Sequence, residues 1–134
     1  ELKRGITLDR QYWETPPKPN FTRGDIALIR EMGFGFVKLI INPAPHMDGG
    51  GLRAESMPYI EAVVRIVLDE GLPVVVCLHP EPEFKNTFLG QPERFPEYLS
   101  FMGAFARFLT ARWEPYMSRW SASADVIRAA WGCS

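Results

Sequence analysis

The sequence predicts an α/β fold: a partial (β/α)8, or TIM, barrel made of about its first three βα units. Residues 36–41 and 73–79 are continuous apolar runs, as in parallel strands covered by helices, and each run follows an amphipathic helix pattern. A closed parallel barrel needs about 250 residues, whereas this chain has 134. We therefore expect residues 1–134 to form a single incomplete barrel domain, with βα units over about 4–113 and an irregular or helical tail over 114–134.

The first unit is a strand, a loop and a helix. Residues 4–8 favour a strand, and the proline-rich segment that follows them cannot be regular structure. Thr22 precedes Asp25 by three positions, which is a capping-box pattern, so we expect a helix over residues 23–32. Gly33 suits the left-handed conformation that ends a helix.

The second unit begins with the strand at residues 36–41. Prolines and three consecutive glycines disfavour both helix and strand pairing over residues 42–51, so we expect a flexible loop where barrel enzymes place substrate contacts. Ser56 can cap the next helix, which ends at Gly71. Its apolar face consists of Ile60, Val63, Val64, Val67 and Leu68. The right-handed crossover rule places the strand at residues 73–79 beside the preceding one.

The third unit continues with a long loop over residues 80–95 and a helix over residues 96–113. The buried face of this helix is expected to consist of Leu99, Phe101, Met102, Phe105, Ala106, Phe108, Leu109 and Trp113. No fourth apolar strand follows, and residues 122–131 predict at best a short helix. Truncation or a shifted reading frame would explain this break in the pattern.

Composition excludes several kinds of partner. The formal net charge is −1 with acidic and basic residues interspersed, so we expect no nucleic-acid partner and no anionic membrane partner. No apolar stretch approaches the roughly 20 residues that cross a bilayer. Cys77 lies in a strand pattern and Cys133 is the penultimate residue, so both are expected to be free thiols. The chain begins at Glu1 without methionine, which fits either a processed secreted protein or a trimmed sequence, and the first of these would give a secreted or periplasmic location.

Several short motifs occur in an order that resembles the amino-terminal part of glycoside hydrolase family 5, the cellulase-like barrels. They are Arg4-Gly5-Ile6-Thr7-Leu8, Phe21-Thr22-Arg23-Gly24-Asp25-Ile26, Met32-Gly33-Phe34, Val37-Lys38-Leu39 and Val74-Val75-Val76-Cys77-Leu78-His79. The resemblance implies a retaining hydrolase of β-linked polysaccharide that needs no cofactor, with β-glucan or a related oligosaccharide as its partner.

The family's catalytic glutamates lie in an Asn-Glu-Pro segment after strand four and in a segment after strand seven. This sequence contains neither segment, and Glu114-Pro115 follows Trp113 with no strand before it. We therefore assign no catalytic residue and expect this chain alone to be inactive, because a retaining mechanism needs two carboxyl groups about 5 Å apart.

Three residues are expected to bind substrate. The resemblance implies that His79 contacts sugar at the cleavage subsite. It also places Lys38 where the family has an arginine at the end of strand two, and lysine keeps the charge but loses the two-pronged donor. Trp13, with Tyr12 beside it, could form an aromatic platform for a sugar ring.

Other polar residues support weaker hypotheses. Glu81 and Glu83 would point the same way in an extended segment, as paired acid/base residues could, but we interpret them as solvated charges in a proline-rich loop. We interpret His46 as a loop residue, and its spacing from His79 does not indicate a metal site.

Two alternatives to a hydrolase stay open. One is a noncatalytic carbohydrate-binding or inactive fragment, and the other is a different TIM-barrel enzyme, since this fold hosts many reactions. In each case an unpaired sheet edge predicts self-association.

Overall fold

The computed structural model describes residues 4–8 and 19–119. In chain order the elements are β1 (Gly5–Leu8), α1 (Arg23–Glu31), β2 (Phe36–Ile41), the 3-10 helix η1 (Ala44–His46), β3 (Met47–Asp48), β4 (Gly51–Leu52), α2 (Ser56–Asp69), β5 (Val74–Leu78), α3 (Pro82–Phe84), the π-helix η2 (Lys85–Leu89) and α4 (Phe95–Arg119). Trp13, Tyr12, Cys133 and the end of the predicted tail lie outside the described residues.

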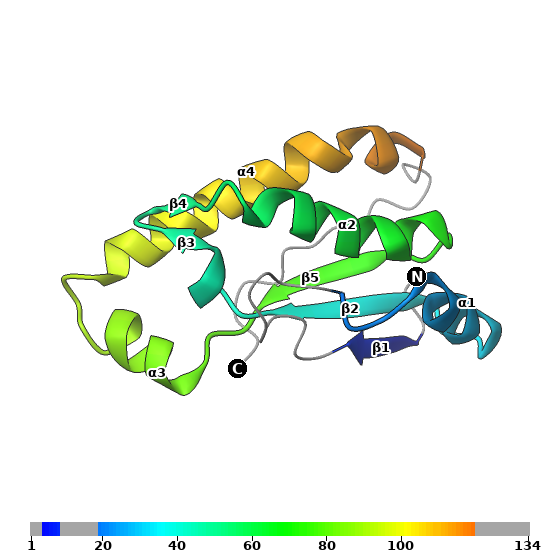
Figure 1. Cartoon of the computed structure of the whole chain (residues 1–134), viewed down its shortest axis with the longest axis horizontal. Helices are drawn as coiled ribbons and strands as arrows, with labels where there is room; N and C mark the ends of the chain where they lie inside the picture. Colours follow the sequence, from blue (N-terminus) through cyan, green and yellow to red (C-terminus); the bar gives the residue numbers. More distant parts are fainter. Residues whose placement is uncertain (1–3, 9–18, 120–134) are drawn as a thin grey trace.

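A three-stranded parallel sheet forms the centre of the molecule, with the order β1-β2-β5 (Figure 1). Gly5 is in register with Phe36, and Ile41 is in register with Leu78. The Phe36 ring lies over Gly5 and occupies the space that a Cβ there would need. The predicted α/β class, and the predicted parallel pairing of the two long apolar strands, are confirmed.

The two faces of this sheet differ in burial. Along β2, Val37, Leu39 and Ile41 are fully buried and share one apolar core with residues of α1 and α2. The intervening Lys38 and Ile40 are only half-buried. Burial of β2 on both faces was therefore the wrong expectation for this chain, because within the described residues the helical layer covers one face.

The capping-box prediction at the start of α1 is confirmed. The Thr22 hydroxyl oxygen accepts a hydrogen bond from the Asp25 amide at 3.3 Å, and the Asp25 carboxylate accepts one from the Thr22 amide at 2.6 Å. The Thr22 backbone amide, and after it the Thr22 hydroxyl, which donates to the same carboxylate at 2.8 Å, lower the pKa of Asp25. Gly33 follows the helix with φ at +83°, as its position predicted.

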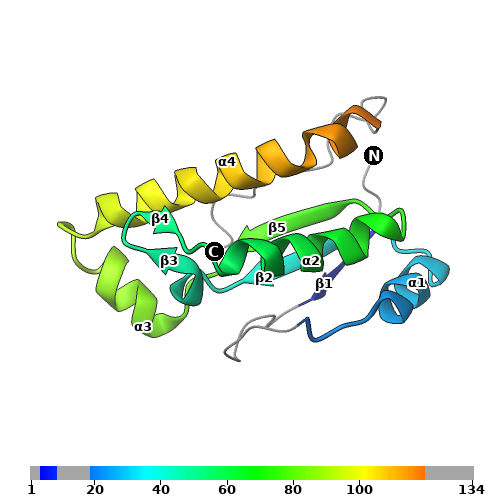
Figure 2. The ribbon, with the colours of Figure 1, turned by 45° about the horizontal axis from the view of Figure 1, so that its top comes forward.

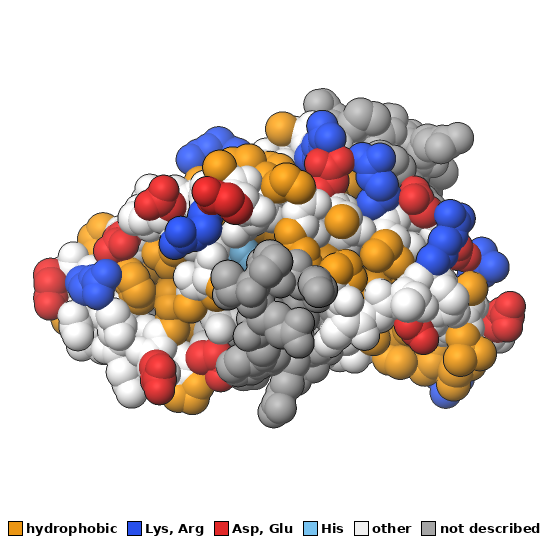
Figure 3. Space-filling model, in the orientation of Figure 1, with side chains coloured by type: hydrophobic (Ala, Val, Ile, Leu, Met, Phe, Trp, Pro, Cys, Tyr) orange, Lys and Arg blue, Asp and Glu red, His pale blue; other side chains and the backbone are white. Residues whose placement is uncertain are grey.

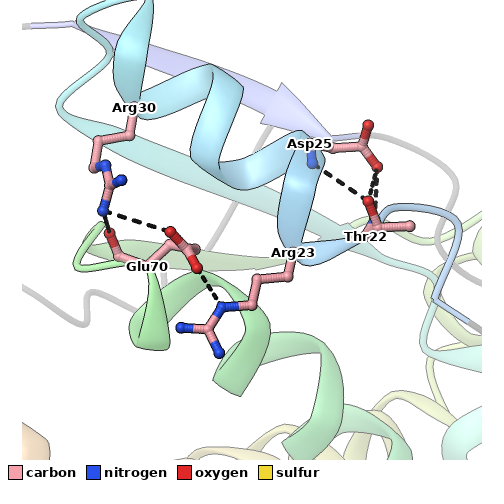
Figure 4. A network of polar contacts seen from close by, with 5 residues as sticks. All are labelled: Thr22, Arg23, Asp25, Arg30 and Glu70. Atoms are coloured by element: carbon pink, nitrogen blue, oxygen red, sulfur yellow. Dashed lines mark hydrogen bonds and ion pairs between the residues drawn. The ribbon is translucent and has the colours of Figure 1, made fainter.

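Charged side chains tie α1 to the carboxyl end of α2 (Figure 4). Glu70, at the end of α2, is buried and accepts a hydrogen bond from Arg23 Nε. Arg30 Nη1 donates to the Glu70 backbone oxygen at 3.0 Å and lies 3.4 Å from its carboxylate. The Glu70 carboxylate thus contacts two arginines that lie in different turns of α1.

The segment between β2 and α2 departs from its prediction. Residues 42–51 were expected to be a flexible loop, but they contain η1 and a short antiparallel hairpin of β3 and β4. Gly49 adopts φ +54°, which permits the two-residue connection between these strands. The glycines and prolines therefore define a turn.

Helix α2 buries the five predicted apolar residues, and Gly71 follows it with φ at +77°. Ser56 does not cap this helix, contrary to its prediction, because it is the first helical residue. Its hydroxyl instead contacts His46.

The last part of the described chain contains more helix than predicted. Residues 80–95 hold α3 and η2, because Pro82 occupies the first turn of α3, where a missing N–H costs nothing. Helix α4 continues past Trp113 and Pro115 to Arg119. Leu99 is 48% exposed rather than buried, and Tyr98, at 6% exposure, packs in its place. The remaining fully buried face of α4 consists of Phe101, Phe105, Leu109 and Trp113.

Helices α2 and α4 run side by side along the sheet (Figures 1 and 2), and Arg112 of α4 donates to Glu61 of α2 at 2.7 Å. In the described part of the chain, no helix has both the length and the apolar character that a membrane span requires. Cys77 of β5 is fully buried, and its sulfur lies 3.9 Å from the Leu78 backbone oxygen.

Apolar side chains reach the surface at the end of the molecule where α1 lies (Figure 3). Leu28 and Met32, one helical turn apart, are 56% and 60% exposed. An exposed apolar pair of this kind is a candidate contact surface.

Candidate functional site

The carboxyl edge of the parallel sheet is the candidate site. The three strands end on one side of the molecule, and the segments that leave β2 and β5 form a rim there, with the β3–β4 hairpin on one side and α3 with η2 on the other (Figure 1). In open parallel α/β sheets, ligands bind outside the carboxyl ends of the strands.

Of the predicted substrate-binding residues, His79 lies at this edge and Lys38 lies inside the sheet. Lys38 lies inside β2, three residues before Ile41, and is in register with Thr7 and Val75. It therefore does not end the strand as the resemblance implied. His79 directly follows β5, and its backbone N–H donates to the Ile41 oxygen at 2.8 Å, which extends the pairing by one step. Both side chains are half-buried.

Lys38 and His79 share one face of the sheet. Side chains alternate along a strand, so Lys38 lies on the face opposite to Val37, Leu39 and Ile41. His79 continues the alternation of β5 one step beyond Leu78, which pairs with Ile41, and this gives it the same face as Lys38. Along the strand direction, Lys38 and His79 are four residues apart, which corresponds to about 13 Å. They can line one extended surface without direct contact.

The paired-carboxylate hypothesis fails on backbone geometry. Glu81 has extended backbone just before α3, but Glu83 belongs to the first turn of that helix. The two residues are thus not alternating members of one extended segment, so their side chains are not aligned by the pleat. Glu83 is exposed, as expected of a solvated charge.

His46 is the polar residue that sequence reasoning misjudged. It was interpreted as a loop residue, yet it is fully buried, and its Nδ1 lies 2.8 Å from the Ser56 hydroxyl oxygen. Its ring stacks on Tyr59 with centroids 6.2 Å apart and an interplanar angle of 13°. Burial, together with the charge of Arg53, lowers the pKa of His46 to about 4. No sequence signal pairs residues ten positions apart across a loop, so this contact could not be predicted.

A groove of about 420 Å³ lies between α2 and α4, and Lys38 and His79 do not line it. It is bordered by the ion pair of Glu61 and Arg112, whose hydrogen bond lowers the pKa of Glu61. Across the described ranges, no cluster of three or more His, Cys, Asp or Glu side chains could hold a metal ion.

Comparison with known proteins gives structural matches only. No family model matches the sequence. No curated protein matches it either. Among solved structures, an endoglucanase aligns with a TM-score of 0.64 over 86% of this chain at 16% identity. Endoglucanase Cel5A from the hyperthermophilic Thermotoga maritima aligns with a TM-score of 0.57 over 94% of this chain at 21% identity. A tri-modular GH5 (subfamily 4) endo-β-1,4-glucanase from Bacillus licheniformis, complexed with cellotetraose, aligns with a TM-score of 0.59 at 17% identity.

This chain spans only part of the proteins it matches: 37% of the first endoglucanase, 38% of the Thermotoga maritima enzyme and 24% of the Bacillus licheniformis enzyme. Sequence identities this low show a likeness of fold alone. The chain therefore shares its helix-flanked parallel sheet with a part of these endoglucanases.

Proposed function

We propose that this chain is the amino-terminal part of a cellulase-like (β/α)8 barrel of glycoside hydrolase family 5, which hydrolyses β-linked glucans. The observation that carries the proposal is the alignment of 94% of the chain with endoglucanases at TM-scores of 0.57 and 0.59. The order of the sequence motifs supports the same family independently.

The half-buried Lys38 and Ile40, on the face of β2 opposite to the helices, support the incomplete barrel, whereas Cys77 of β5 on the same face is fully buried. In a closed barrel this face lines the interior, and neighbouring strands pair with both edges of any group of strands. Within the described residues, β1 and β5 each pair on one side only. The remaining βα units would cover this face, and until they do, the open edges favour self-association.

Lys38, His79 and Trp13 are the proposed saccharide contacts. Lys38 and His79 support this assignment by sharing one face of the sheet, with His79 at its carboxyl edge. Solved structures similar to this chain include complexes with cellobiose and with mannotriose, so sugar binding is compatible with the fold. A secreted or periplasmic location would suit a polymer substrate.

Binding can be tested on this chain directly. We expect cellotetraose to shift the backbone amide NMR signals around Lys38 and His79. His79→Ala and Lys38→Ala should each weaken binding roughly tenfold, because each removes a polar contact worth about 1.4 kcal/mol. Arg65→Ala is the matched control, since Arg65 is exposed on α2 and pairs only locally with Glu61 at 2.6 Å. Unchanged affinity in both site variants would contradict the assignment.

Catalysis is tested by comparing this chain with a longer one. We expect no hydrolysis of soluble β-glucan by the 134-residue chain, because it lacks the two glutamate segments of the family. A longer polypeptide whose reading frame continues through an Asn-Glu-Pro segment should hydrolyse it. Turnover by the short chain would refute the inactive assignment, and binding without turnover in the longer form would favour the noncatalytic alternative.

A further inference from the structure

The segment between β2 and α2, residues 42–53, is a closed structural unit, here called the rim loop. The His46 amide donates to the Pro43 oxygen at 2.9 Å, and the Arg53 amide donates to the His46 oxygen at 2.8 Å. Arg53 Nη2 donates to the Met47 oxygen at 2.9 Å. These bonds connect His46 and Met47, in the middle of the rim loop, to Pro43 and Arg53 near its two ends.

One side chain fastens the rim loop to α2. The His46 ring is fully buried, with the Ser56 hydroxyl 2.8 Å from its Nδ1 and the Tyr59 ring stacked beside it. Ser56 and Tyr59 are three residues apart and therefore lie on the same side of α2. His46 thus inserts between the rim loop and the first turn of the helix.

The rim loop has little stability of its own. Its strands, β3 and β4, contain two residues each, and an isolated hairpin is marginal in water. Its tip packs closely on α4, where a Cβ added to Gly50 would lie 2.8 Å from the Ser100 hydroxyl oxygen. The closed position therefore depends on anchors to the two helices and on Met47, which is buried in the apolar core.

Protonation would weaken the His46 anchor. The groups that face its ring include Ser56 and Tyr59 from α2 and the cationic Arg53 from the segment after β4. A charged imidazolium in this position loses hydration and meets a like charge. Release of the rim loop would return the ring to water.

We propose that His46 is an acid-sensitive latch: the neutral ring holds the rim loop on α2, and the protonated ring releases the loop while the parallel sheet stays folded. The latch is independent of the proposed sugar-binding function.

Residue-resolved hydrogen exchange tests the latch. The pKa of His46 is about 4 when the rim loop is closed, and it takes the ordinary value of about 6.5 when the loop is open. The equilibrium constant for opening the loop should therefore rise about twentyfold as the pH falls from 7 to 5. The protection factor of the Arg53 amide, which bonds to the His46 oxygen, should fall by that factor. The His79 amide, bonded to the Ile41 oxygen in the sheet, should keep its protection. An equal fall at both amides, or none at Arg53, would overturn the proposal.

Variants assign the effect to one histidine. His46→Gln should abolish the pH dependence at Arg53, whereas His79→Gln, the matched control, should keep it. If His46→Gln does not fold, Ser56→Ala replaces it. That variant keeps the titrating ring but loses its partner, so protection at Arg53 should already be about tenfold lower at pH 7. Unchanged protection in Ser56→Ala, or retained pH dependence in a folded His46→Gln protein, would contradict the latch.

Discussion

Glu70 is a buried residue that accepts the charged contacts between α1 and α2. Its carboxylate and its backbone oxygen together accept from Arg23 and Arg30 (Figure 4). Hydrogen bonds to charged groups contribute more than neutral ones, and a buried partner left without them adds a desolvation cost. We infer that this residue, more than the exposed ion pairs, fixes α1 against α2.

Glu70→Ala should lower the free energy of unfolding by about 2 kcal/mol, because two guanidinium groups lose their shared acceptor. Glu70→Gln should lower it by less, since the amide oxygen still accepts one bond. Urea unfolding monitored by circular dichroism measures both changes. Arg65→Ala, which breaks an exposed pair on α2, should cost about 0.5 kcal/mol or less. Equal effects at Glu70 and Arg65 would show that burial does not matter here.

At the residue scale, sequence reasoning succeeded where a signal is local. The Thr22 capping box and the positive φ of Gly33 each follow from a residue and its near neighbours. His46 and Glu70 gain their roles from partners brought close by folding, at separations of 10 and 40 to 47 residues. No single-sequence pattern encodes such contacts.

At the element scale, the cap of α1 is the feature most open to test. Thr22→Ala should destabilise the protein by about 1 kcal/mol at neutral pH, because the Asp25 amide loses its acceptor. Thermal unfolding measures the difference from the unmodified chain.

The same substitution should matter less in acid. The folded chain holds the pKa of Asp25 below its ordinary value, so the stabilisation by this carboxylate is present above the ordinary pKa and is lost as pH falls through the lowered one. The Thr22 hydroxyl donates to this carboxylate at 2.8 Å, and Thr22→Ala removes that bond while keeping the backbone donor. The gap between Thr22→Ala and the unmodified chain should therefore narrow as acid protonates Asp25. A constant gap would show that the hydroxyl contributes only as the acceptor for the Asp25 amide.

Strands and amphipathic helices were the elements that sequence predicted best. The apolar run at residues 36–41 predicted the observed bounds of β2, and the spacing of apolar residues along α2 predicted its buried face. The β3–β4 hairpin and the η2 turn were missed, since prolines and glycines can begin a helix or close a turn as well as interrupt one. Leu99 was misassigned because the buried stripe of α4 passes through Tyr98.

At the scale of the whole molecule, β1 and β5 pair on one side only within the described residues, and the proposed barrel would place further polypeptide against these two edges. We expect the isolated chain to form oligomers at micromolar concentration, because open strand edges and the exposed Leu28 and Met32 favour association. Size-exclusion chromatography with light scattering measures the mass. A single monomer peak with cooperative unfolding would count against an incomplete fold.

Leu28→Lys combined with Met32→Lys should shift this distribution toward monomer if the α1 surface takes part. Both positions are more than half exposed, so the charges stay in water and the fold should be retained. If the double variant associates as strongly as the unmodified chain, the strand edges alone drive association.

The burial of Cys77 gives the sheet a chemical reporter. Its sulfur lies in the strand that ends beside His79, where an alkylating reagent cannot reach it in the closed protein. Alkylation of Cys77 therefore requires β5 to separate from its surroundings, and the rate of alkylation measures how often this opening occurs. Polypeptide added against the open edge of that strand would slow the modification, so completion of the fold could be followed by mass spectrometry at one sulfur atom.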